Sequence, residues 1–181
     1  MISLAVLFYI FIFFFAVIGA VRGWAKEILV TSSIILAMFI IVVLENYVPF
    51  VKDFFVSGGT PESPVIPKSQ LYMRLIILGV LAFFGYQTPN ISKLAGQRFA
   101  REKLQDTLLG FFLGALNGYL LVGTVWSFLH QANYPFDWII TPLPQDAANL
   151  VKYLPPQYLM KTPTIFFAAG LVFIFILVVF I

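Results

Sequence analysis

Long apolar runs alternate with shorter polar stretches along the whole chain. At about 1.5 Å of rise per helical residue, each run can cross most or all of a hydrocarbon core of roughly 30 Å. The pattern predicts one integral membrane domain over residues 1–181, an all-α polytopic transmembrane helix bundle with a four-span core and a fifth, C-terminal apolar span. The predicted spans are residues 2–21, 28–44, 71–88, 108–129 and 164–181.

The polar stretches between the spans contain two further predicted elements. Residues 57–67 are rich in proline and glycine and are expected outside the hydrocarbon, where water satisfies irregular backbone. Residues 91–103 and 144–154 are expected to form short amphipathic interfacial helices. The first of these is basic. It would rest on anionic headgroups or, equally, extend the third span as a solvated helix. The last span ends abruptly, so we expect the natural protein to continue beyond it.

Three glycines recur at every fourth position of the fourth span: Gly110, Gly114 and Gly118. Residues four apart share a helix face, and small side chains let another helix backbone approach closely in lipid. Asn117 falls on nearly the same face, as an interhelical hydrogen-bonding residue or, alternatively, as part of a substrate path. The strict register favours a packing groove over the general enrichment of glycine in membrane helices. Gly123 is expected to point away from this groove.

The end of the first span carries a second face of small residues, which includes Gly19 and Gly23. This makes the first span the expected neighbour of the glycine groove. Arg22 and Asp106 lie at the same predicted depth, so we expect them to form an ion pair, with Glu27 as a competitor for the arginine.

Composition narrows the possible functions. The chain is 61% hydrophobic and 10% charged, whereas soluble domains carry about 25% charged residues. A scattered net charge of +3 does not indicate nucleic-acid binding. The chain has no cysteine and one histidine, His130, which excludes thiolate zinc sites, cysteine-ligated clusters and a bis-histidine haem held by this chain alone. We expect no cofactor and no metal site.

Candidate chemistry is sparse. A hydrolytic triad would need His130 as its base, but only Asp137 is near in sequence and no nucleophile motif accompanies them, so His130 is interpreted as an interfacial residue. No acidic residue is predicted at mid-depth in a span, which argues against a proton-coupled pump. Arg74, in the first turn of the third span, is expected to extend to the interface. The chain is therefore not expected to be an enzyme.

Lysine and arginine are concentrated in two short loops. Residues 22–27 and 89–107 are much denser in positive charge than the longer loops on the opposite side. Since positively charged loops stay in the cytoplasm, the N-terminus is predicted to lie outside.

Two motifs resemble those of the colicin V production protein (CvpA-like) family of bacterial inner membranes. They read Arg22-Gly23-x-x-Lys26-Glu27 and Asp106-x-x-Leu109-Gly110-x-x-x-Gly114-x-x-x-Gly118, and the resemblance covers roughly residues 5–156. Two positions where the family often has arginine are Thr107 and Asn117 here. The resemblance implies an inner-membrane location and a role in toxin production or export and envelope physiology, without a known catalytic activity.

These observations support two hypotheses. In the first, the chain is a non-catalytic scaffold or accessory subunit that works by helix packing within a larger membrane complex. In the second, it is a small oligomeric transporter or export channel component with Asn117 and Arg22 on the path. The expected partners are the lipid bilayer and other integral membrane subunits or further copies of the chain.

Overall fold

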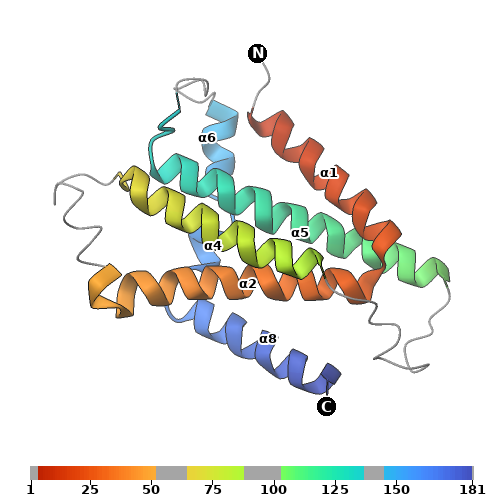
Figure 1. The fold of residues 1–181 in the computed structure, drawn as a ribbon. Helices are drawn as coiled ribbons and strands as arrows, with labels where there is room; N and C mark the ends of the chain where they lie inside the picture. Colours follow the sequence, from red (N-terminus) through yellow and green to blue (C-terminus); the bar gives the residue numbers. More distant parts are fainter. Residues whose placement is uncertain (1–3, 52–64, 88–102, 137–144, 181) are drawn as a thin grey trace.

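The computed structural model describes residues 4–51, 65–87, 103–136 and 145–180, and the regular elements in these ranges are α-helices. They are α1 (Leu4–Arg22), α2 (Trp24–Tyr47), α4 (Lys68–Tyr86), α5 (Lys103–Gln131), α6 (Gln145–Val151), α7 (Pro156–Leu159) and α8 (Thr164–Phe180). α1, α2, α4 and α5 are each long and apolar enough to cross a membrane. The predicted all-α membrane bundle is therefore confirmed, and the chain is a multi-pass membrane protein (Figure 1).

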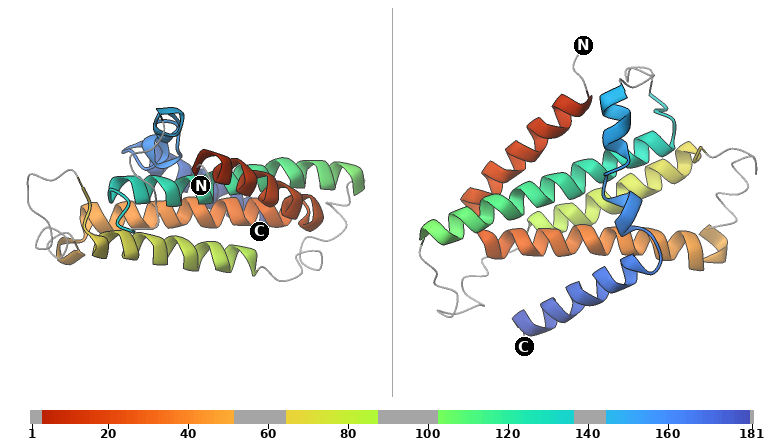
Figure 2. Two further views of the ribbon diagram at one scale, coloured as in Figure 1. Left: turned by 90° about the horizontal axis from the view of Figure 1, so that it is seen from above. Right: turned by 180° about the vertical axis from the view of Figure 1, so that it is seen from behind.

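α2 and α5 form the centre of the bundle (Figure 2). α1 packs along α5, α4 packs against both central helices, and α8 lies against α2. α1 and α5 share the most extensive contact between any two elements that the structure describes. The remaining surface of α1 is left for lipid, with Phe13 65% exposed and Phe14 56% exposed.

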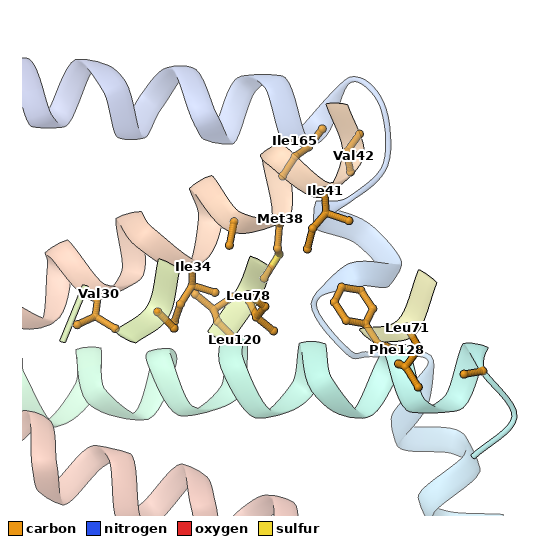
Figure 3. Packing of buried hydrophobic residues seen from close by; sticks show 13 residues of the cluster. Val30, Ile34, Met38, Ile41, Val42, Leu71, Leu78, Leu120, Phe128 and Ile165 are labelled. Atoms are coloured by element: carbon orange, nitrogen blue, oxygen red, sulfur yellow. The ribbon is translucent and has the colours of Figure 1, made fainter. Parts of the chain in front are cut away.

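An apolar core fills the space between α2, α4 and α5. Its buried side chains include Ile34, Met38, Ile41, Leu78, Leu120 and Phe128 (Figure 3). Lipid chains are as apolar as these side chains, so close van der Waals packing, rather than exclusion from water, holds such a core together in a membrane.

A single glycine separates α1 from α2. α1 ends at Arg22, Gly23 adopts φ +85°, and α2 begins at Trp24. Glycine tolerates this backbone conformation because it has no Cβ. The charged segment predicted as a turn before the second span therefore belongs largely to α2, which starts four residues earlier than position 28. As a result, Glu27 lies inside the bundle with 0% of its surface exposed. The sequence analysis placed Glu27 in a charged turn before the second span, whereas the structure places it in the first turn of α2.

The C-terminal part of the chain is a bent pair of helical segments. Residues 147–159 and 164–178 pass the span criteria only together, and they meet at an angle of 62°. α8 alone has 17 residues and packs against α2, where Ile165 joins the apolar core. The predicted fifth span is thus a helix preceded by a sharply bent segment, which contains the short helix expected at residues 144–154. The other predicted interfacial helix, at residues 91–103, lies outside the described residues except for Lys103.

Candidate functional site

The glycine face of α5 is occupied by α1. A methyl group on Gly19 would overlap the main-chain carbonyl oxygen of Gly110 and would lie 2.7 Å from Cα of Gly114. A methyl group on Gly118 would lie 2.8 Å from Cβ of Phe15. All three α5 glycines are buried, and α1 and α5 meet backbone to backbone. The structure therefore places the predicted groove inside this chain rather than on its surface.

Asp106 contacts the junction between α1 and α2. Its Oδ1 accepts a hydrogen bond of 3.0 Å from the main-chain N–H of Trp24, the first residue of α2. A methyl group on Gly23 would lie 2.7 Å from Oδ2 of the same carboxylate. An anion at this position accepts from an N–H group that has no partner within its own helix, and it faces the positive end of the α2 dipole. Asp106 thus fixes the start of α2 from a different helix.

Arg22 pairs with Glu27 rather than with Asp106. Its Nη1 donates to Oε1 of Glu27 at 2.7 Å, and its Nη2 donates to the main-chain oxygen of Tyr86 at 2.9 Å. The guanidinium carbon lies 4.5 Å from the centre of the Tyr86 ring. The predicted Arg22–Asp106 ion pair was wrong, because the early start of α2 turns Glu27 toward Arg22. Lys26, in the same turn, is partly buried and belongs to neither ion pair formed among the described residues.

Asn117 connects this ion pair to the middle of α5. Its Nδ2 donates to Oε2 of Glu27 at 2.8 Å and to the Glu27 main-chain oxygen at 2.9 Å. Its Oδ1 accepts from the Thr31 hydroxyl at 2.7 Å. Asn117 is 0% exposed, and these bonds give both polar atoms of its buried amide a hydrogen-bond partner. We call Arg22, Glu27, Thr31 and Asn117 the α2-start cluster.

A second polar cluster lies at the other end of α2. Arg74 donates from Nε and Nη2 to the two carboxylate oxygens of Glu45, at 2.6 and 2.8 Å. Its Nη1 donates to Oε1 of Gln131 at 2.6 Å, and Gln70 donates to Glu45 at 2.9 Å. Arg74 is only 7% exposed, because Glu45 and Gln131 hold its guanidinium between the helices. We call Glu45, Gln70, Arg74 and Gln131 the α2-end cluster.

The sequence analysis missed the α2-end cluster. The available signal was one acidic and one basic residue at the facing ends of the second and third predicted spans, Glu45 and Arg74. An antiparallel pair of helices brings such ends together. In the structure α2 and α4 pack against each other, and their charges meet.

Gly123 is also a packing position. It points away from α1, as expected, but a methyl group there would lie 2.7 Å from Cδ of Pro155. Nearby, the Tyr119 hydroxyl donates to the main-chain oxygen of Tyr153 and lies 2.7 Å from the Tyr158 hydroxyl. The segment between α6 and α7 therefore packs on the C-terminal half of α5, through a glycine contact and through tyrosine hydrogen bonds.

His130 lies at the exposed C-terminal end of α5. Its Nδ1 is 3.3 Å from the Tyr134 hydroxyl, which also accepts a hydrogen bond of 3.0 Å from Trp126. Burial raises the pKa of the Tyr134 phenol, and the hydrogen bond from Trp126 opposes this shift. Asp137 lies outside the described residues. Within the described ranges, no three His, Asp or Glu side chains gather as a metal site would require.

The two motifs noted in the sequence meet at one junction. Residues 22–27 form the break between α1 and α2, and residues 106–118 form the part of α5 that packs against it. The family model described as colicin V production protein matches residues 4–142. No curated protein and no solved structure matches the chain. The match covers most of the chain, including both motifs and the helices α1, α2, α4 and α5, and the chain therefore belongs to the colicin V production protein family.

Proposed function

We propose that this chain is a non-catalytic protein of the bacterial inner membrane that works by helix packing, as a scaffold or accessory subunit of a larger membrane assembly. By analogy with its family, that assembly would serve toxin production or export, or envelope physiology. The N-terminus would lie outside. In support, Arg22, Lys26 and Lys103 lie at the end of the bundle where α1 ends and α2 and α5 begin, the end predicted to be cytoplasmic.

The main support is the mutual neutralisation of the buried charges. Arg22 is paired with Glu27, and Arg74 is paired with Glu45. A buried charge that takes part in chemistry or transport must exchange partners, whereas these charges are held by short bonds to other helices. Buried ion pairs rarely add much net stability, but breaking one is costly, so they fix which helices pair. This arrangement suits a protein whose task is to hold its shape.

The outer faces support association with lipid or with other helices. On α8, Phe167 is 75% exposed, Leu171 is 71% exposed and Val178 is 76% exposed. Such faces are compatible with lipid, and a partner helix would replace lipid there without exposing polar backbone. An accessory subunit needs a rigid interior and an outer apolar face of this kind.

The alternative is a small oligomeric transporter, and one observation favours it. Side chains of the α2-start cluster form a continuous polar chain from Arg22, which is 19% exposed, through Glu27 to Asn117 near the middle of α5. A polar chain that enters a bundle this far is also a feature of solute paths.

Purification in a mild detergent, followed by native mass spectrometry, tests the proposal. We expect other membrane chains to co-elute with this chain in a fixed ratio. Purified chain in liposomes should not increase solute permeability, and Asn117→Leu should leave that permeability unchanged. A homo-oligomer that moves solute, with flux reduced by Asn117→Leu, would replace the accessory role with transport.

A further inference from the structure

We infer that a groove between the end of α1 and the start of α5 binds an anionic phospholipid. The groove has a volume of about 560 Å³ and is lined by Ala20 of α1 and by Lys103, Leu104, Thr107, Leu108 and Phe111 of α5. Its volume falls within the range of small-molecule sites, about 300–1,000 Å³. This inference goes beyond the proposed function, because it requires no partner protein and involves neither polar cluster.

The shape of the groove follows from the packing of α1 and α5. The glycine contact holds the helices together around Gly19 and Gly110, and α5 continues past the end of α1 (Figure 1). Of the helices that the structure describes, none covers the first turns of α5 on this side. Leu104 is 76% exposed and Leu108 is 52% exposed. In a membrane protein an open apolar groove of this kind accommodates an acyl chain.

The charge at one end of the groove selects the headgroup. Lys103 is exposed and takes part in neither ion pair formed among the described residues. It opens α5, at the end of the bundle where Arg22 and Lys26 also lie. A phosphate-bearing headgroup with net negative charge complements an ammonium group above an apolar groove, whereas a zwitterionic headgroup does so less well. The occupant is therefore a phospholipid such as phosphatidylglycerol, with its headgroup at Lys103 and an acyl chain along Leu104 and Leu108.

Lipid quenching tests this site directly. The chain has no cysteine, so Thr107→Cys provides a single thiol for a fluorophore inside the groove. The labelled protein is placed in phosphatidylcholine vesicles that contain a minor fraction of brominated phosphatidylglycerol or of brominated phosphatidylcholine. One lysine near a membrane surface favours an anionic lipid about fivefold, so we expect about fivefold stronger relative quenching by phosphatidylglycerol. Because both lipids carry bromine at the same depth, their ratio reports headgroup preference.

Two controls make the result specific. A label at Val80→Cys, on an exposed position of α4, should give equal quenching by the two lipids. Lys103→Gln should abolish the preference at Thr107→Cys, whereas Lys161→Gln, at an exposed lysine before α8, should leave it intact. Equal quenching at Thr107→Cys, a preference that survives Lys103→Gln, or an equal preference at Val80→Cys would overturn the site. Failure of both lipids to quench would also overturn it, since the groove would then be closed to lipid.

Discussion

Asn117, near the middle of α5, donates from Nδ2 to both a carboxylate oxygen and the main-chain oxygen of Glu27, at 2.8 and 2.9 Å. Glu27 is thereby held between Asn117 and Arg22, which come from different helices. One carboxylate links α1, α2 and α5. The link lies beside the glycine contact, because Asn117 directly precedes Gly118. Packing and polar contacts therefore stabilise the same junction.

Removing one member of this ion pair should cost more than removing both. Glu27→Leu leaves the mostly buried Arg22 without its partner, and we expect a loss of about 3 kcal/mol in the free energy of unfolding. The double variant Arg22→Met with Glu27→Leu leaves no unpaired charge and should lose less. Unfolding of the purified protein in mixed detergent micelles measures both values. A double variant as unstable as Glu27→Leu alone would show that the charge pairing does not account for the loss.

Gly123→Ile should displace the segment between α6 and α7 from α5. Its side chain would collide with Pro155, whose Cδ lies 2.7 Å from the position of a Cβ. Val151, the last residue of α6 and the one before this segment, is 4% exposed, so a thiol at Val151→Cys should react slowly in an otherwise unchanged chain. Gly123→Ile should accelerate the reaction of this thiol about tenfold or more. A loss of about 1.4 kcal/mol in the free energy that holds the segment against α5 would give a tenfold increase.

The control for this prediction is Gly79→Ile. Nothing lies within 4 Å of a Cβ built at Gly79, so the thiol at Val151→Cys should react as slowly as before. Equal reactivity of the thiol in the Gly123→Ile and Gly79→Ile variants would mean that the contact at Gly123 does not hold the segment between α6 and α7 against α5.

The elements of the fold could be predicted from the sequence, because lipid imposes a simple length and polarity requirement on each span. The four long helices lie where the apolar runs are, and the regular spacing of Gly110, Gly114 and Gly118 indicated a shared face. Both signals are local in the chain. They depend on helix geometry alone and not on which helices become neighbours.

Asn117 was predicted as an interhelical hydrogen-bonding residue and is one. The rest of the polar interior could not be predicted, because it depends on backbone details and on partners distant in sequence. A single glycine at φ +85° starts α2 early and carries Glu27 into the bundle. Arg74 is buried because Glu45, 29 positions away, meets it across two helices. Gly123 points away from the glycine groove as expected, but a helical wheel shows the face of a residue and not what covers it. Pro155 covers it in the structure.

The predicted orientation can be tested with single cysteines at two exposed residues of opposite bundle ends. Ser69 lies at the start of α4 and Gln105 at the start of α5. With the N-terminus outside, a membrane-impermeant thiol reagent should label Ser69→Cys in cells with a permeabilised outer membrane. Gln105→Cys should be labelled only after the inner membrane is opened. The reverse pattern would invert the orientation and would place the groove at Lys103 on the outer side.

The account depends most on the backbone contact between α1 and α5. A side chain on Gly114 would overlap the main-chain oxygen of Phe15 and lie 2.9 Å from Cα of Gly19, so α1 cannot stay in place. We expect Gly114→Ile to lower the free energy of unfolding by about 3 kcal/mol and to reduce the retention of partner chains.

Gly79→Ile is the matched control for this measurement, since Gly79 lies within α4 and has open space around it. Its effect should stay within about 0.5 kcal/mol. The most direct measurement is therefore the difference in unfolding free energy between Gly114→Ile and Gly79→Ile in the same detergent. A difference of about 2 kcal/mol or more would support close packing between the backbones of α1 and α5, since overpacking such a contact is costly. Equal stability of the two variants would contradict it.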